Sequence, residues 1–464
     1  MDQRFIALLK KFNYSCDSVI FQFIRYTQPG WLFNLRPTIE EDFASCYIPE
    51  ENIDPAFLDI TYETHTARLA DAGYRLWCKG VLLESNTNEI KNISAEKPGL
   101  QDEYIFIRKY WGNAWAYYTL LIRLFTFKNP VNEINHFFKT RYIKKIDVFD
   151  SPIMYPAYEN FYSELIATTP KVAVIIPTLN RYTYLKDVLH DLEQQTYKNF
   201  EVLVFDQSDD FQPEFYTQFQ LDIKITKQVE KKLWTARNNA IKSTTASYLL
   251  FFDDDSRVGS DWISEHLKCI DFFNCDISAG VSLAVTGQKI SKSYAYFRWA
   301  DQFDSGNAMV KRDVFKKIGL FDEQFNGMRM GDGEFAYRAY LAGIKSISNY
   351  KASRVHLKVS SGGLREMGSW DGFRPIKWFA PKPVPSVLYL FKKYLPPHLC
   401  RNAILLGFLL SNIPYKQKRK SSMLMLSVIL TFIKSPLLFI QYARSKKIAL
   451  TMLKNDAGAE MLSQ

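Results

Sequence analysis

The feature that most constrains this chain is an apolar run that ends on three consecutive acids. Residues 248–255 read YLLFFDDD, so a segment able to form a buried strand delivers Asp253, Asp254 and Asp255 to its end. Carboxylates that gather at the rim of a core raise one another's pKa, and a divalent cation with oxygen ligands offsets that repulsion. A solvated acidic turn is the simpler alternative. The run predicts a buried strand that leads into a cation site.

Apolar runs and helical spacings alternate upstream of this strand. The expected strands cover 172–181, 201–206 and 223–226, and the expected helices cover 184–194 and 234–241. Pro177 is expected to break the first strand, because proline lacks the N–H that a strand needs. Strands that alternate with helices predict a parallel sheet with helices packed on it.

The carboxyl ends of these strands would bring polar residues to one edge of the sheet. In open sheets of this kind ligands bind outside that edge, where Asn180, Asp206 and the acids 253–255 would meet. The chain has no G-x-G-x-x-G fingerprint there, which argues against a dinucleotide cofactor.

Six motifs in a fixed order carry a resemblance to a known family. They are VAVIIPTLNR at 172–181, FDQSDD at 205–210, ARNNA at 236–240, FFDDD at 251–255, SGNAMVKRDVFKKIGLFDEQF at 305–325 and GDGEFAYRAYLAG at 331–343. Together they make residues 172–356 resemble the catalytic domain of the family 2 glycosyltransferases. The resemblance implies the α/β GT-A fold, a Rossmann-like mixed, mostly parallel sheet flanked by helices. We expect an α-rich N-terminal region before it and a helical C-terminal region after it.

The resemblance also implies roles for particular residues. Donor-nucleotide binding is assigned to Pro177, Thr178, Asn180, Arg181, Asp206, Arg237 and Asp253. Asp206 would accept a hydrogen bond from the pyrimidine ring, and Asp253 and Asp255 would form the family's D-x-D pair. Asp255 would bind the metal directly, with His356 as a further ligand beside Asp253. Gly306, Asn307 and Gly331 would lie in the loops around the donor and acceptor.

The expected metal ion is Mn²⁺ or Mg²⁺, because a divalent ion stabilises the charge on a departing nucleotide diphosphate. Imidazole suits Mn²⁺ better than Mg²⁺, although a purely structural role for His356 is the simpler alternative. The acceptor hydroxyl must lose a proton, which a nearby carboxylate can take. We assign this base to Asp332, with an N-cap as the alternative role. Relatives commonly carry Glu-Asp where this chain has Gly331 and Asp332, so Glu334 is the substitute base.

These residues predict an inverting glycosyltransferase. It would move a sugar from a nucleotide-sugar, most often UDP-linked, to a hydroxyl of a lipid-linked or growing surface glycan. A sugar nucleotidyltransferase is one alternative, but it would need a glycine- and Arg/Lys-rich phosphate loop where this chain has PTLNR. A catalytically retired binding or scaffold protein is the other. It is disfavoured because Asp206, Asp332 and the D-x-D pair are all retained.

Length and cysteine usage bound the organisation of the chain. Its 464 residues exceed one typical domain. We predict an accessory region at 1–165, the catalytic domain at 171–365 and a basic helical region at 366–464. Six cysteines without a C-x-x-C pair indicate thiols in a reducing compartment, and the first residues lack the pattern of a secretory signal. We therefore expect a cytoplasmic protein.

The basic excess is concentrated near the C-terminus. The chain carries a net charge of +10, and residues 411–464 alone hold nine basic and two acidic residues. The apolar run 423–433 is flanked by cations at 416–420 and 444–447, and it is shorter than the roughly 20 residues that span a bilayer. This pattern predicts peripheral contact with the cytoplasmic face of an anionic membrane. A core helix pair and a broken membrane span are the alternatives, and no nucleic-acid partner is expected.

Overall fold

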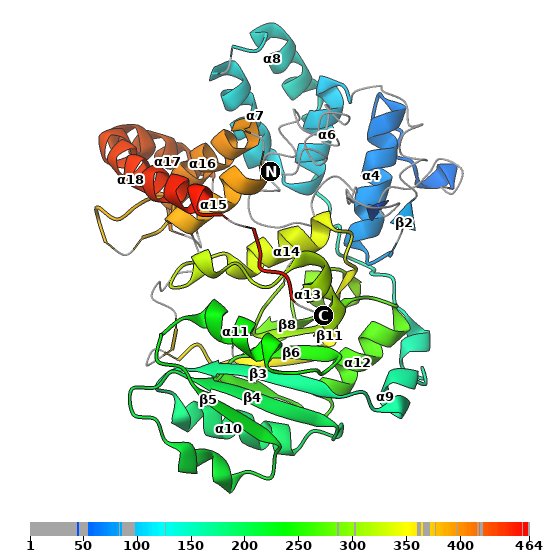
Figure 1. Cartoon of the computed structure of the whole chain (residues 1–464). Helices are drawn as coiled ribbons and strands as arrows, with labels where there is room; N and C mark the ends of the chain where they lie inside the picture. The colour runs from blue at the N-terminus through cyan, green and yellow to red at the C-terminus, as the bar shows by residue number, and fades with distance from the viewer. Residues whose placement is uncertain are drawn as a thin grey trace. The chain divides into compact units, whose positions relative to one another are not determined.

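The computed structural model describes residues 44–45, 54–82, 84–85, 98–125, 127–284, 287–300, 303–359, 363–364, 372–375, 377–395, 397–414, 417, 421–456 and 458–462. The chain divides into two compact units (Figure 1). One comprises Met1–Pro152 and Ser369–Lys454, and the other comprises Ile153–Gly368 and Asn455–Gln464. The first unit thus combines two segments that are far apart in the sequence, and the last ten residues belong to the second unit. Our division into three consecutive segments stays a prediction.

The second unit is built on a nine-stranded sheet. Its strands are β3 (Val172–Thr178), β4 (Phe200–Asp206), β5 (Ile223–Lys227), β6 (Tyr248–Phe252), β7 (Ser256–Val258), β8 (Ile277–Leu283), β9 (Arg298–Trp299), β10 (Asn307–Lys311) and β11 (Ser346–His356). They follow the order β5-β4-β3-β6-β10-β8-β11-β7, and β9 pairs with β11. The first four strands are parallel, whereas β10 runs antiparallel to both of its neighbours. The predicted mixed sheet is confirmed, with more antiparallel pairing than we predicted.

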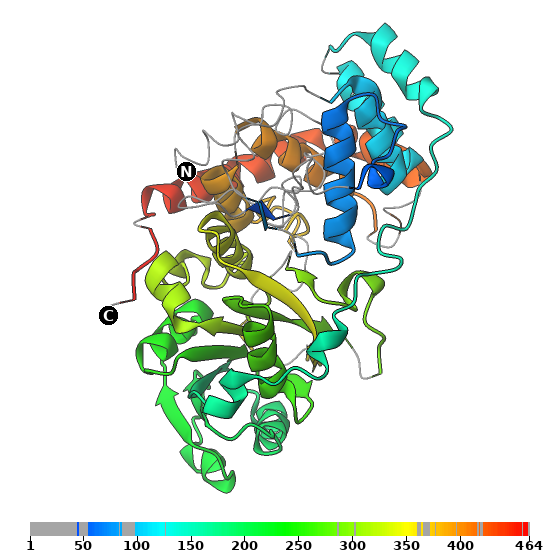
Figure 2. The ribbon, with the colours of Figure 1, turned by 90° about the vertical axis from the view of Figure 1, so that its right-hand side faces the viewer.

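Helices flank this sheet. They are α9 (Glu164–Thr168), α10 (Tyr182–Glu193), α11 (Leu233–Lys242), α12 (Trp262–Phe272), α13 (Arg312–Ile318) and α14 (Gly331–Leu341). The apolar positions that predicted α10 are the ones it buries, because helical spacing places them on one face. Figure 2 shows the sheet and these helices turned by 90°.

One expectation about the first strand is corrected. Pro177 does not end β3, because pairing with β4 continues to Thr178 opposite Asp206. Pairing with β6 on the other side stops at Ile175. Proline is tolerated where a ladder ends, since its missing N–H is not needed there. The strand therefore carries Thr178 as far as the sheet edge where Asp206 ends β4.

The first unit is rich in helices, as predicted. Its described elements are β1 (Ala44–Ser45), β2 (Glu84–Ser85), α4 (His65–Cys78), α6 (Leu100–Tyr110), α7 (Asn113–Phe125), α8 (Pro130–Lys139), α15 (Pro385–Tyr394), α16 (Pro397–Ser411), α17 (Ser421–Ile433) and α18 (Ser435–Lys454). A buried ion pair links two of the helices, because Lys109 of α6 lies 2.8 Å from the Asp71 carboxylate of α4. The Tyr62 hydroxyl also donates to Asp71, so the buried carboxylate is fully compensated.

Two further findings concern the helices and the cysteines of the described residues. In the described part of the chain no single helix is long and apolar enough to cross a membrane, but the pair Ser422–Ile433 and Ser435–Lys454, bent by 76°, could do so by length and composition. The described cysteines Cys78, Cys269, Cys275 and Cys400 are buried and free. Cys16 and Cys46, and the basic residues at 416 and 418–420, lie outside the described residues.

Glu201 at the start of β4 supplies a test of the electrostatics that hold the sheet. Its buried carboxylate lies 2.8 Å from the Lys171 ammonium and 2.7 Å from that of Lys224. Burial alone would raise the pKa of Glu201, but the hydrogen bonds from these lysines and from Thr244 lower it to about 2. A lowered pKa in the folded state stabilises the protein above the ordinary value near 4.5, and this contribution disappears as the pH falls toward 2.

We therefore expect Glu201→Gln to lose about 1–2 kcal/mol of unfolding free energy at pH 7, an amount discounted because both lysines are partly exposed. The difference from the wild type should shrink at pH 3. Urea denaturation of both proteins at the two pH values measures it. A difference that stays equal at pH 7 and pH 3 would contradict the assignment.

Candidate functional site

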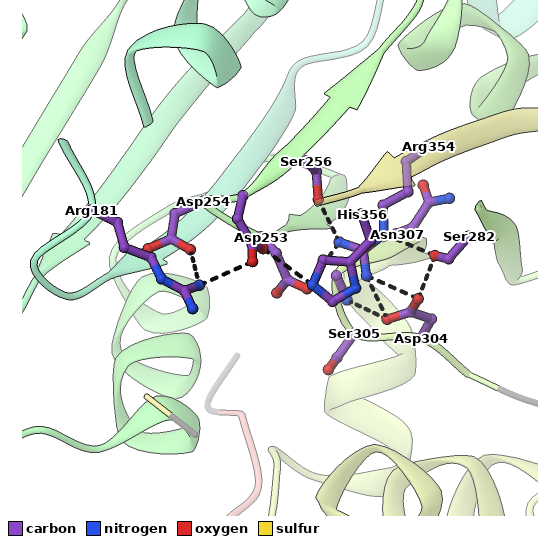
Figure 3. A network of polar contacts seen from close by, with 12 residues as sticks. Arg181, Asp253, Asp254, Ser256, Ser282, Asp304, Ser305, Asn307, Arg354 and His356 are labelled. Atoms are coloured by element: carbon purple, nitrogen blue, oxygen red, sulfur yellow. Dashed lines mark hydrogen bonds and ion pairs between the residues drawn. The ribbon is translucent and has the colours of Figure 1, made fainter. Parts of the chain in front are cut away.

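The acid triplet lies directly after β6, and Figure 3 shows its members Asp253 and Asp254 together with Arg354 and His356. The first member, Asp253, is held between two arginines. Asp253 Oδ1 accepts from Arg237 Nη2 at 3.1 Å, and Asp253 Oδ2 accepts from Arg354 Nη1 at 2.9 Å. Both arginines are buried. The charge that we expected a metal ion to balance is thus already shared with guanidinium groups of α11 and β11.

Asp254 is bound by residues of β3 and of the loop that follows it. Its carboxylate accepts from Arg181 Nη1 at 2.9 Å and from the Thr178 hydroxyl at 2.8 Å. Burial raises the pKa of Asp254 to about 6, against the opposing charge of Arg181. Thr178 and Arg181, which we assigned to the donor nucleotide, therefore also support the acid triplet.

Asp255 faces His356 at the end of β11. The imidazole Nε2 lies 3.2 Å from Asp255 Oδ1, and Arg181 Nη1 lies 3.2 Å from Asp255 Oδ2. Burial alone would raise the pKa of Asp255, but the hydrogen bond with His356 and the charge of Arg181 hold that pKa below its ordinary value. Asp255 is therefore held in its ionised form.

The structure brings together the three residues that we predicted as metal ligands. One ligand atom each from Asp253, Asp255 and His356 lies within 4.8 Å of the other two. Two carboxylates and one imidazole suit a divalent ion such as Mn²⁺. The residues present therefore fit a metal ion, and the alternation in D-x-D is explained, since only the outer two acids face this group.

Arg354 is a residue that the sequence reasoning missed. Besides Asp253, it binds Asp304, with Nη2 lying 3.0 Å from Asp304 Oδ2, and it donates to the Ser256 and Ser282 hydroxyls. Burial would lower the pKa of Arg354, but the charges of Asp304 and Asp253 raise it above the usual value. The only sequence signal was its place two positions before His356, which puts both residues on the same side of an extended strand.

Asp206 lies at the predicted sheet edge, but its carboxylate already accepts hydrogen bonds from two tyrosine hydroxyls. Asp206 Oδ2 accepts from the Tyr182 hydroxyl at 2.5 Å and from the Tyr216 hydroxyl at 2.7 Å. The other oxygen accepts from the Ser208 N–H at 2.9 Å. Asp206 is fully buried. A pyrimidine ring could reach this carboxylate only if a tyrosine moved aside, so the predicted nucleotide contact stays a prediction.

The loop after β3 is braced against the loop after β4. Asn180 has a φ of 55°, and its side-chain amide donates to Asp209 at 2.9 Å. The Asn180 N–H in turn donates to the Ser208 hydroxyl at 2.8 Å. Pro177 is buried within β3. Asn180 is thus exposed at the edge where the donor is expected, while Pro177 is part of the core.

Arg237 connects the acid triplet to the start of α14. Its guanidinium lies 5.1 Å from the centre of the Trp234 ring, and Nη1 donates to the Ser305 hydroxyl at 3.0 Å. Gly331 also packs against Trp234, because a Cβ there would lie 2.3 Å from Trp234 Cε2. The tight fit explains Gly331 where relatives carry Glu, and it sets the position of the next residue, Asp332.

Asp332 lies inside the first turn of α14 and is not its N-cap. The helix begins at Gly331, and Asp332 Oδ1 accepts from the Gly333 N–H at 2.8 Å. The side chain is partly exposed. The N-cap alternative is therefore wrong, and the partial exposure of Asp332 is compatible with the role of a base.

Glu334, our substitute base, has a different setting. It is fully buried and pairs with Arg338 at 2.8 Å. Arg338 also donates to the carbonyls of Gly319 and Leu320, at 3.2 and 2.8 Å. This geometry corrects our expectation, because a buried, ion-paired carboxylate that anchors a loop cannot meet an acceptor hydroxyl.

The environment of Asn307 corrects a second expectation about the site. Its Oδ1 accepts from Trp262 Nε1 at 2.8 Å, and its Nδ2 donates to the carbonyls of Val281 and Ala352 at 3.2 and 3.0 Å. The side chain is completely buried in the sheet. Asn307 therefore joins β10 to its neighbours and does not face a substrate, whereas the resemblance had implied a place in a donor or acceptor loop.

The ARNNA motif also has a structural part that we did not foresee. The Asn238 side chain makes two hydrogen bonds with the backbone of Phe321. Its Nδ2 donates to the Phe321 carbonyl at 2.9 Å, and its Oδ1 accepts from the Phe321 N–H at 3.0 Å. Trp234 N–H donates to Asn326 Oδ1 at 2.8 Å. Helix α11 therefore carries Arg237 to the acids and fixes the segment that leads into α14.

The hydrogen bonds from Arg237 and Arg354 form a clamp on the Asp253 carboxylate. A substitution at Gly306 tests whether this clamp matters. A Cβ at this position would lie 2.1 Å from Asp253 Oδ2 and 2.5 Å from Arg354 Nη1. We expect Gly306→Ala to displace the Asp253 carboxylate and to cost about 1–3 kcal/mol of unfolding free energy. Gly259→Ala is the matched control, because its Cβ would meet only the Asp261 carboxylate at 3.2 Å. Thermal unfolding and nucleotide titration of both variants measure the effect, and a Gly306→Ala protein that behaves like the control would refute the clamp.

Comparison with known proteins agrees with this geometry. The profile of the family described as glycosyl transferase family 2 matches residues 173–337. Glycosyltransferase GlyA of Streptococcus pneumoniae is 32% identical over 114 residues, 24% of this chain and 16% of the relative. O-antigen biosynthesis protein RfbC of Myxococcus xanthus is 25% identical over 277 residues, 51% of this chain and 21% of the relative.

A third relative is the GalNAc(5)-diNAcBac-PP-undecaprenol beta-1,3-glucosyltransferase of Campylobacter jejuni, 24% identical over 208 residues, 40% of this chain and 64% of the relative. The chain spans less than two thirds of the length of each of these three relatives.

Two solved structures are also similar. S. aureus TarS 1-349 has 18% identity and a TM-score of 0.40, covering 62% of this chain and 90% of that one. The mannosyltransferase PcManGT of Pyrobaculum calidifontis, in complex with GDP-Man and Mn²⁺, has 16% identity and a TM-score of 0.39, covering 65% of this chain and 92% of that one. The match to the family described as glycosyl transferase family 2 covers residues 173–337, and it coincides with the ordered motifs and with most strands of the mixed sheet.

Proposed function

We propose that this protein transfers a sugar from a nucleotide-sugar to a hydroxyl of a glycan acceptor, with inversion at the anomeric carbon. The observation that carries the proposal is the joint placement of two kinds of carboxylate. Asp253 and Asp255 lie with His356 at the strand ends, and the contact of Arg237 with Trp234 links them to the start of α14 beside Asp332.

The donor diphosphate would bind beside the acids at the end of β6. Asp253, Asp255 and His356 would hold Mn²⁺ or Mg²⁺, which supplies positive charge for the departing diphosphate. Arg181 would add a second positive charge from the loop after β3. The clamp of Arg237 and Arg354 fixes the Asp253 carboxylate before the donor arrives, which lowers the cost of ordering the site. A UDP-sugar is the donor that we propose.

Asp332 would act on the acceptor. As the acceptor oxygen forms its bond to the anomeric carbon, its proton would pass to the Asp332 carboxylate and the nucleotide diphosphate would leave from the opposite face. A single displacement of this kind inverts the anomeric centre. Glu334 takes no part, because it is buried against Arg338.

The acceptor that we propose is a lipid-linked or growing surface glycan. Two relatives support this class by name, one as an O-antigen biosynthesis protein and one as a transferase to an undecaprenol-linked glycan. Cytoplasmic localisation stays a prediction. A nucleotidyltransferase would release pyrophosphate, and a retired protein would bind the donor without hydrolysing it, so assays for pyrophosphate and for donor hydrolysis separate the three functions.

Removal of the Asp255 carboxylate tests the metal site. We expect Asp255→Ala to abolish the Mn²⁺-dependent part of UDP affinity, a loss of about tenfold or more. Asp210→Ala is the control, because Asp210 is an exposed acid at the same edge of the sheet. Calorimetric titration with and without Mn²⁺ measures the difference. If folded Asp255→Ala retains the full metal-dependent gain, the metal assignment is wrong.

Asp332→Asn separates chemistry from binding. Asparagine keeps the acceptor for the Gly333 N–H but loses basicity, so we expect turnover to fall about 100- to 10,000-fold while donor affinity stays within threefold or so. Glu334→Gln should instead lower the thermal midpoint of unfolding, because it weakens the pair with Arg338. Turnover and donor affinity are measured separately for both variants. Near-normal turnover in Asp332→Asn would remove the base from this residue.

A further inference from the structure

Helix α17 carries apolar side chains on the side that faces away from its unit. Met425, Val428, Ile429 and Phe432 recur at helical spacing, and they are 68%, 40%, 56% and 82% exposed. We call these four residues the outer face. A single exposed apolar residue needs no explanation, but a continuous stripe marks an interaction surface.

The inner side of α17 holds the polar groups. Ser427 is buried, and the Thr431 hydroxyl donates to the Ser427 carbonyl at 2.6 Å. The same hydroxyl accepts from Asn412 Nδ2 at 2.8 Å, next to the end of α16. A surface helix of a water-soluble unit shows the opposite distribution, with polar residues outside. Polar groups that bond across helices while apolar side chains point outward are typical of helices in contact with lipid.

Other elements of the same unit also expose large apolar side chains. Phe439 in the first turns of α18 is 73% exposed, and Trp378 and Phe379 in the loop before α15 are 68% and 56% exposed. Side chains of α18 fix this loop, because Gln441 Nε2 donates to the Trp378 carbonyl at 2.6 Å and Arg444 Nη1 donates to the Phe379 carbonyl at 2.9 Å. Exposed tryptophan held in place is frequent where proteins meet the headgroup region of a membrane.

The charge of this region indicates which surface it would meet. The sequence from 411 to 454 contains nine basic residues and no acidic one. Lys434 joins α17 to α18, and Lys446 and Lys447 are exposed on α18. Basic residues beside an apolar face are attracted to anionic lipid headgroups. Binding to a water-soluble protein would not require both the basic residues and these large exposed apolar side chains.

We propose that α17 lies in the interface of an anionic lipid bilayer, with its outer face among the acyl chains and Trp378 and the lysines at the headgroups. Its 13 residues measure about 20 Å, which is too short for the roughly 30 Å of hydrocarbon. The 76° bend before α18 then directs the chain away from the axis of α17. This attachment is independent of the glycosyl transfer proposed above, and it would keep the enzyme at a surface that contains lipid-linked acceptors.

Vesicle binding by the full chain tests the proposal. Wild-type protein should sediment with vesicles that contain phosphatidylglycerol, less with pure phosphatidylcholine, and less as salt is added. Ile429→Glu combined with Phe432→Glu should weaken binding about 100-fold, because two charges enter the outer face. Val131→Glu combined with Ile134→Glu is the matched control, since these residues are exposed at the same spacing on α8. The control should bind like the wild type.

Each other outcome overturns the proposal. If the Ile429 and Phe432 variant is folded by circular dichroism and binds phosphatidylglycerol vesicles like the wild type, the outer face does not enter lipid. If the wild type ignores vesicles and forms a dimer that the variant loses, the surface joins two copies of the chain. If the bound wild type resists extraction by alkaline carbonate, α17 and α18 form a broken span. Asp332→Asn should bind vesicles normally, so the failure of one proposal does not affect the other.

Discussion

The clamp of two buried arginines on Asp253 is the interaction on which the candidate site depends. Arg237 comes from α11, Arg354 from β11 and Asp253 from the end of β6, so one carboxylate joins three elements that are far apart in the chain. A buried guanidinium without a partner would be strongly destabilising, which means that each element holds the others in register. Asp304 completes the group by neutralising Arg354 from the other side.

This arrangement leaves the site pre-organised for anions and cations alike. Asp255 and His356 are placed beside the clamp, and Arg181 reaches the same acids from the loop after β3. Because positive and negative groups are already balanced, binding a metal ion and a diphosphate together would exchange one set of charge pairs for another. The existing charge balance also explains why three consecutive carboxylates are tolerated at the rim of a core, since each lies close to a positively charged side chain.

The two proposals concern different units and rest on different physics. The catalytic unit is organised by buried charge, whereas α17 is distinguished by the inversion of its apolar and polar sides. In both places the informative observation is a side chain in an environment that its chemistry does not prefer. Buried arginines and exposed phenylalanine each require a partner, and that partner is Asp253 in the first case and, as we propose, lipid in the second.

The sequence by itself predicted the strands and helices from 172 to 252, the position of three acids at the end of β6, and a resemblance to a glycosyltransferase family, because period-2 and period-3.6 patterns and ordered motifs are local properties. It could not show that Arg354 would meet Asp253 across 101 positions, that Tyr182 and Tyr216 would cover Asp206, or that Asn307 and Glu334 would be buried structural groups. Those outcomes were decided by the tertiary structure, because hydrogen-bond partners and burial depend on which strands become neighbours in the sheet.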